Sequence, residues 1–197
     1  MSVGELKDTI IIIRHGKPAL SRTMWLDWRG YRHWWVQYDE GGLMPDQDVP
    51  ESVVAAAAEA DLVISSPLRR AYESAQLAAG RNPDIVDADL VEASLPPPHL
   101  GLIRFRPTTW GTLARMLWWF GWTDGLESHA DARIRGEHMA GKLVDHAAGG
   151  KTIFVAAHGW YNRILKTGLV KRGWQCVSQN GDLHWSLRRF ERATRES

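Results

Sequence analysis

Three short apolar runs, rich in β-branched residues, recur along the chain. They are Thr9–Ile13, Asp61–Ser65 and Thr152–Ala157, and their interiors are continuously apolar rather than alternating with polar residues. This pattern is typical of strands buried on both faces of a parallel sheet. We therefore predict three neighbouring parallel strands at these positions.

Longer segments with spaced apolar residues predict helices around these strands, at residues 50–60, 66–79, 128–148 and 160–170. Ser66 and Pro67 fit the cap and first position of the second helix, and Gly80 fits its end, because proline and glycine favour these opposite helix ends. Asn180-Gly181 predicts a turn into a final strand over residues 183–190.

Strands that alternate with helices predict an α/β fold: a three-layer sandwich with a mainly parallel sheet and helices on both faces. The chain shows no internal repeat and no linker, so we expect one domain over residues 1–197. The prolines at 96–98 begin an insertion, at about residues 96–126, that we expect to form a tryptophan-rich cap on this domain.

The composition and charge of the chain limit the kinds of molecule and metal that we expect it to bind. The chain has 24 basic and 23 acidic residues, so its net charge does not favour nucleic acid or an anionic membrane. The sole cysteine, Cys176, excludes an intrachain disulfide and a cysteine-rich zinc site, and we interpret it as a core residue. No signal-peptide pattern precedes Thr9, and the run at Ile10–Ile13 is too short to span a membrane, so we expect a cytoplasmic protein.

Residues that can do chemistry follow each of the three predicted strands. Arg14-His15 follows the first, Ser66 follows the second and His158 follows the third. The carboxyl ends of parallel strands meet at one edge of a sheet, where ligands bind in open α/β folds. The sequence therefore predicts that these side chains form one site.

The three segments resemble the motifs of a known family. Residues 13–16 read Ile-Arg-His-Gly, residues 65–71 read Ser-Ser-Pro-Leu-Arg-Arg-Ala, and residues 156–159 read Ala-Ala-His-Gly. In this order they are similar to the histidine phosphatase superfamily, which includes the cofactor-dependent phosphoglycerate mutases. The resemblance spans residues 9 to about 170, nearly the whole chain.

The resemblance implies a covalent phosphohistidine on His15, with a phosphate site made by Arg14, Arg70, His158 and Gly159. Physical chemistry favours the same roles, because arginine forks match phosphate oxygens and a neutral imidazole is a good nucleophile. No carboxylates or histidines cluster at metal-ligand spacing in the sequence, so we expect neither a metal nor another cofactor.

A leaving alkoxide needs a proton, which the family takes from a glutamate after the helix that follows its second motif. Glu92 fits that place, and Asp87 and Asp89 are alternatives. A further alternative is that all three are surface charges.

The chain also departs from the family pattern. Many relatives have a phosphate-binding asparagine beyond the first motif, whereas residues 17–22 contain none. Ser21 or Arg22 replaces it, or the contact is missing. Ser74 stands where threonine is usual, and the glycine-tryptophan-glutamate sequence of mutase-like members is absent around Glu92. The last departure argues against mutase activity more than against phosphatase activity.

Eight of the 11 tryptophans fall in two segments, residues 25–35 and 110–122. One interpretation is a cap in which these side chains form a core. Another is an apolar, arginine-rimmed mouth, with Arg22, Trp28 and Trp118 in its wall, for a phosphate ester with an apolar or aromatic moiety. A membrane-surface contact or a homodimer contact is a third.

These observations favour a phosphomonoesterase that acts on a small phosphorylated metabolite. The alternatives are a phosphoglycerate mutase-type transfer and a non-catalytic protein of the same fold that binds or senses a phosphorylated ligand. The intact set of Arg14, His15, Arg70 and His158 argues against the non-catalytic alternative.

Overall fold

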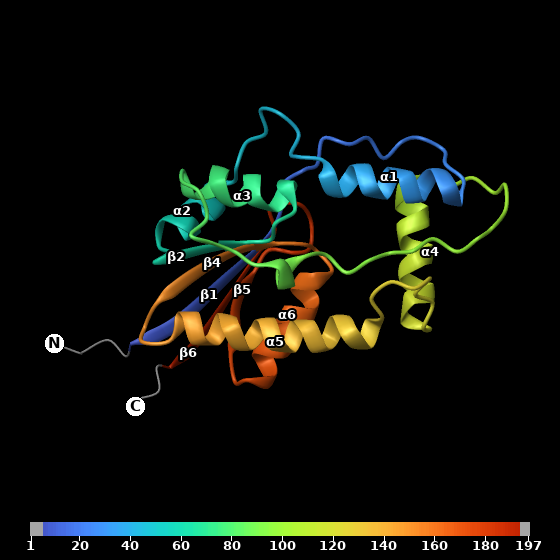
Figure 1. Ribbon diagram of the computed structural model, residues 1–197. Helices are drawn as coiled ribbons and strands as arrows, with labels where there is room; N and C mark the ends of the chain where they lie inside the picture. The colour runs from blue at the N-terminus through green and yellow to red at the C-terminus, as the bar shows by residue number, and fades with distance from the viewer. Residues whose placement is uncertain (1–5, 194–197) are drawn as a thin grey trace.

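The computed structural model describes residues 6–193, which form a six-stranded sheet with helices around it (Figure 1). The strand order across the sheet is β3-β2-β4-β1-β6-β5. The strands are β1 (Lys7–Arg14), β2 (Leu62–Ser65), β3 (Ile85–Val86), β4 (Thr152–Ala157), β5 (Gln175–Gln179) and β6 (Leu187–Ala193).

The sheet is mainly parallel, as predicted. The four strands from β3 to β1 run parallel to one another, whereas β6 is antiparallel to β1 and β5 is antiparallel to β6. The final strand begins at Leu187 rather than at residue 183, because Leu183 lies exposed in the turn that follows Gly181. The sequence did not indicate β5, whose residues are mostly exposed and polar.

Helices cover both faces of the sheet, which confirms the three-layer sandwich. In Figure 1, α2 (Glu51–Ala58) and α3 (Arg69–Ala79) lie on one side of the sheet, and α5 (His129–Ala147) and α6 (Tyr161–Lys171) lie on the other. Ile11 and Ile13 of β1 pack in the core on the α2–α3 side, and Ile10 and Ile12 pack in the core on the α5–α6 side. The continuous apolar run of β1 is therefore buried on both faces.

The helix ends follow from local chemistry. The Ser128 hydroxyl and the Asp131 carboxylate form a capping box that begins α5, and Gly80 ends α3 with a left-handed φ of 66°. The prediction for the start of α3 was wrong by two residues. The first helical residue is Arg69 rather than Pro67, because Leu68 has an extended backbone and is itself the N-cap. The Ser66 hydroxyl accepts from the Leu68 N–H at 3.3 Å and also bonds the His158 ring.

The two tryptophan-rich segments pack against each other beside the sheet, as α1 (Trp28–Glu40) and α4 (Pro107–Trp119) (Figure 1). Buried Tyr31, Trp34, Tyr38 and Trp110 form their shared core. The predicted tryptophan-rich cap is thus present as an aromatic cluster. Within residues 6–193, no helix combines the length and the hydrophobicity needed to cross a membrane.

Replacing Trp118 tests how much this aromatic packing contributes to the stability of the fold. Its side chain is fully buried against Ala93 and Ala132, and its indole N–H donates to the Glu127 carbonyl at 2.9 Å. We expect Trp118→Ala to lower the free energy of unfolding by about 3–5 kcal/mol, since the change leaves a large cavity. Chemical denaturation would measure this loss.

The matched control is Trp119→Ala, because the neighbouring Trp119 is 49% exposed. Its expected loss is below about 1 kcal/mol. Equal losses in the two variants would contradict the assignment of Trp118 to the core.

Candidate active site

His15 directly follows β1 and lies at the carboxyl edge of the sheet, where it is only 2% exposed. Its Nδ1–H donates to the carbonyl of Gly16 at 2.7 Å. This bond fixes the tautomer and leaves the Nε2 lone pair free for a reacting group. Gly16 itself is needed here, because a Cβ at that position would lie 2.6 Å from the Trp185 ring.

A second histidine, His158, follows β4 and packs beside the first. The ring centroids of His15 and His158 are 5.2 Å apart. His158 Nε2 lies 2.9 Å from the Ser66 hydroxyl, and its buried Nδ1 has no partner in residues 6–193. The ends of β1, β2 and β4 thus meet as predicted.

Burial lowers the pKa of both His15 and His158 well below the usual value of 6.5. The cations Arg70 and Arg14 act in the same direction on both rings. His15 is therefore neutral at physiological pH, which is the protonation state that a histidine nucleophile requires.

Arg70 extends from the first turn of α3 and is completely buried. Its guanidinium donates to the Tyr38 carbonyl at 2.8 Å and to the Asp39 carboxylate at 3.0 Å. Its Nε–H is buried without a partner in the described residues. Burial raises the pKa of Asp39, and the ion pair with Arg70 opposes that shift. The sequence did not identify Tyr38 or Asp39, the α1 residues that hold this arginine.

Arg14 faces the same space from the end of β1. One of its terminal nitrogens donates to the Asp182 carbonyl at 2.6 Å, while its buried Nε–H has no partner in residues 6–193. A Cβ at position 159 would lie 2.8 Å from that Nε, so only glycine allows the arginine this close to the backbone. Gly159 therefore shapes the site by having no side chain.

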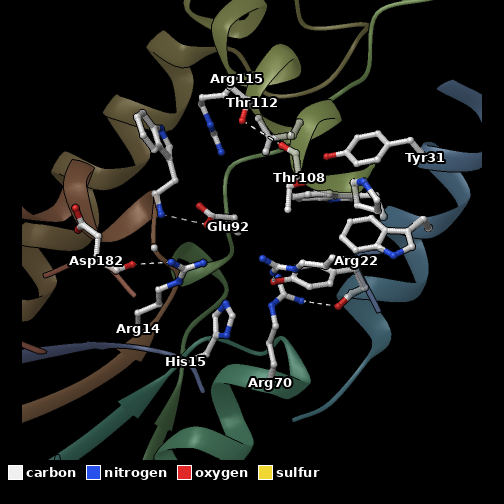
Figure 2. A pocket seen from close by; sticks show the side chains of 18 of the residues that line it. Arg14, His15, Arg22, Tyr31, Arg70, Glu92, Thr108, Thr112, Arg115 and Asp182 are labelled. Atoms are coloured by element: carbon white, nitrogen blue, oxygen red, sulfur yellow. Dashed lines mark hydrogen bonds between the residues drawn. The ribbon is translucent and has the colours of Figure 1, made fainter. Parts of the chain in front are cut away.

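Glu92 points into the site near the guanidinium of Arg14, on the opposite side from Arg22 and Arg70 (Figure 2). Its carboxylate accepts hydrogen bonds from the backbone N–H groups of Trp160 at 3.2 Å and Tyr161 at 3.0 Å. These two donors belong to the amino-terminal end of α6. Glu92 is consequently held in one orientation toward the arginines.

The two alternative carboxylates are placed elsewhere. Asp87 and Asp89 both accept from the Lys142 ammonium at 2.9 Å, and Asp89 also lies 3.1 Å from the His138 ring. Neither lines the cavity that contains His15. Of the three candidates for proton donor, only Glu92 reaches that cavity.

The cavity has a volume of about 530 Å³ and extends from His15 toward α1 and α4 (Figure 2). The predicted residues Arg14, Arg22, Arg70, Glu92 and Gly159 line it together with His15. Of the two proposed replacements for the missing asparagine, Arg22 is in the wall and bonds the Tyr38 hydroxyl, whereas the Ser21 hydroxyl bonds Thr23.

The aromatic wall consists of other residues than those predicted. Trp118 is in the core, and Trp28 stacks on His99 at a centroid distance of 4.1 Å, outside the cavity lining. Both point away because α1 and α4 present other faces to the cavity. The aromatic side chains that line it are Tyr31, Trp34, Trp35, Tyr38, Trp119 and Trp160.

A third histidine, His184, lies beside the nucleophile, with its ring centroid 5.7 Å from that of His15. Burial lowers the pKa of His184 to about 4, helped by Arg14 and Arg22. The sequence did not indicate His184, because this residue was placed in the predicted final strand, whereas it lies in a turn before β6. In residues 6–193 no group of three or more His, Cys, Asp or Glu side chains could hold a metal ion.

A neutral histidine with a free nitrogen thus faces arginine N–H donors and an oriented carboxyl group. Such an arrangement can transfer a phosphoryl group, because that reaction needs a nucleophile and preplaced cations around the phosphorus. The sequence profile of the histidine phosphatase superfamily (branch 1) matches residues 10–191. The chain belongs to the histidine phosphatase superfamily.

Several solved structures have a fold similar to that of this histidine phosphatase superfamily member. A mutant phosphoserine phosphatase from Entamoeba histolytica, in complex with phosphoserine, aligns over 92% of this chain and 89% of its own, with 16% identity and a TM-score of 0.55. The ecdysone phosphate phosphatase of Bombix mori, in complex with tungstate, aligns over 92% and 88%, with 15% identity and a TM-score of 0.54.

A mycobacterial hydrolase is more similar in sequence, with 25% identity over 84% of this chain and 82% of its own, and a TM-score of 0.52. A sequence search of curated proteins gives no match. These neighbours thus support the fold, the sequence profile shows the superfamily, and the chemistry must be argued from the site.

Proposed function

We propose that this superfamily member is a phosphomonoesterase that hydrolyses a small phosphorylated metabolite through a phosphohistidine on His15. The observation that carries the proposal is the His15 ring itself: it is neutral, its Nδ1–H is held by the Gly16 carbonyl, and its Nε2 is free. Arg14 and Arg70 line the same cavity, so an ester phosphate placed there meets two guanidinium groups.

In the first step His15 Nε2 attacks phosphorus, and the bond between phosphorus and the ester oxygen breaks. The carboxyl group of Glu92 gives its proton to the leaving oxygen. In the second step the Glu92 carboxylate takes a proton from water, the water oxygen attacks phosphorus, and the phosphorus–nitrogen bond breaks. Inorganic phosphate leaves, and His15 and Glu92 return to their starting states.

Arg14 and Arg70 supply the fixed positive charge for this reaction, and the neutral His158 ring adds a polar nitrogen beside them. The buried Nε–H groups of both arginines and the buried Nδ1 of His158 have no protein partner in residues 6–193. Unpaired buried polar groups at such a site are explained by a ligand that satisfies them. The three equatorial oxygens of a transferring phosphoryl group fit this requirement.

Trapping the intermediate tests the proposal. Brief reaction with a ³²P-labelled ester, followed by denaturation, should give an acid-labile and base-stable label on His15. Phosphate release without a bisphosphorylated primer would separate hydrolysis from mutase-type transfer, and binding without any label would favour the non-catalytic alternative. A label on serine or aspartate would refute the proposed nucleophile.

We expect activity to persist after exhaustive treatment with EDTA. The proposed mechanism assigns to arginines the charge stabilisation that Mg²⁺ gives in other phosphoryl-transfer enzymes. The rate of phosphate release before and after chelation checks this, with a change of less than about twofold expected on that basis. Complete loss that a divalent cation restores would contradict it.

A further inference from the structure

Arg115 of α4 lies at the far end of the cavity from His15 and Arg70 (Figure 2). It is only 8% exposed, and its guanidinium stacks on the rings of Trp118 at 4.6 Å and Trp160 at 4.7 Å. An aromatic face attracts the positive charge of a guanidinium that stacks on it. It does not accept hydrogen bonds from the guanidinium N–H groups, which point outward in the guanidinium plane. The arginine is therefore held in place while its donors remain available.

No hydrogen bond or ion pair joins this guanidinium to another group within residues 6–193, and its buried Nη1 has no acceptor. Burial lowers the pKa of Arg115 to about 10, and nearby Glu92 acts in the opposite direction, so the side chain remains charged at neutral pH. Arg70, by contrast, has two protein acceptors. A buried charge without an acceptor is costly unless a ligand supplies one.

A second unpaired donor stands at the same end of the cavity. The Tyr31 hydroxyl is buried without a partner in the described residues, and it lies 3.5 Å from the Cβ position of Gly111 on α4. Tyr31 and Arg115 both line the cavity, and Arg115 is among the charges that act on the Tyr31 hydroxyl. Each of the two side chains therefore has a donor that is unpaired within residues 6–193, in the same part of the cavity.

The charges of the cavity point to an anion with more than one charged group. Five arginines and only two carboxylates line it, and one of those carboxylates, Asp182, is paired with Arg163 and Arg188. A phosphate at His15 would engage Arg14 and Arg70 and leave Arg115 unpaired. The aromatic side chains that line the cavity offer apolar surface for the part of the ligand between its two anionic groups.

We propose that the substrate carries a second anionic group, separated from the scissile phosphate by an apolar or aromatic body, and that Arg115 and Tyr31 bind this group. The inference rests on the proposed phosphatase function and specifies its substrate class. Arg115 is then the residue that selects for the second charge, while Arg14 and Arg70 bind the phosphate.

Two matched series of aryl phosphates test the inference. One series bears a para carboxylate on zero to three methylene groups, and the other bears the neutral carboxamide of the same shape. We expect kcat/KM to favour the carboxylate by about 10- to 100-fold at the best length, as for a charge-assisted hydrogen bond. Arg115→Met should reduce this ratio to about 1.

Arg163→Met is the matched control. Arg163 also lines the cavity, but it is half exposed and paired with Asp182 at 2.9 Å. Its replacement should leave most of the carboxylate preference in place. An equal fall of the ratio in both variants would show a general field effect and overturn the inference, as would a wild-type ratio near 1 at every length.

If Arg115→Met does not fold, Tyr31→Phe removes only a hydroxyl and should lower the same ratio by several-fold; an unchanged ratio would count against the inference. If no ester is hydrolysed, the phosphatase proposal fails by itself. Binding of the two series to His15→Ala protein, followed by tryptophan fluorescence, then decides the inference. A carboxylate preference there supports the second anion site, and equal binding refutes it.

Discussion

His15→Ala is expected to reduce turnover on the order of 10⁶-fold, as when a covalent nucleophile is removed from other enzymes. No neighbouring side chain can take over the role at the same place, because His158 and His184 are centred 5.2 and 5.7 Å from the His15 ring. Steady-state phosphate release, with protein from a strain lacking other phosphatases, would measure the loss.

The fold is expected to survive this change. Among the described residues 6–193, the only hydrogen bond of the His15 side chain is to the carbonyl of the next residue, and the ring borders a cavity that water can fill. A melting temperature close to that of the wild type is therefore the control. Residual activity above about 1% in a folded variant would place the nucleophile elsewhere.

Glu92→Gln has the second-largest expected effect, and its size should depend on the leaving group. Alkyl phosphates leave as basic alkoxides and need the proton, so their kcat should fall by about 10²- to 10⁴-fold. With p-nitrophenyl phosphate, whose leaving group is stable as an anion, the bond-breaking step should slow far less. The ratio of the two rates, measured for wild type and variant, is the readout.

Asp89→Asn is the matched control for the proton donor. Asp89 lies in the same loop region, but its carboxylate is engaged by Lys142 and His138 and lies outside the cavity. This change should slow both esters equally, and by less than tenfold. If Asp89→Asn reproduced the leaving-group dependence and Glu92→Gln did not, the two roles would have to be exchanged.

The sequence predicted the parts of the site that depend on strand ends. His15, Arg14 and His158 follow continuous apolar runs, and parallel strands bring their carboxyl ends together whatever the connections contain. Glu92 was the preferred one of three candidate carboxylates, on the resemblance alone. Its selection depends on the position of the first turn of α6, 68 residues away in sequence, which no local pattern reports.

The residues of α1 that accept hydrogen bonds from Arg70 could not be predicted, for the same reason. Tyr38 and Asp39 are ordinary residues of an amphipathic helix, and only the docking of α1 on the body brings them to Arg70. Helical spacing places Arg115 near Trp118, but it does not show that both are buried. The tryptophans were noticed, yet which of them face the cavity depends on how α1 and α4 are rotated about their axes.

The hydrogen bonds that Arg70 donates to Tyr38 and Asp39 couple the position of α1 to the proposed phosphate site. α1 cannot turn or shift without moving the two acceptors that orient the buried Arg70, the arginine proposed to bind phosphate. A substitution in α1 that reshapes the aromatic wall for a new substrate would therefore also change the orientation of Arg70. A change of specificity in this chain should therefore need coupled substitutions in α1 and around Arg70 rather than a single one.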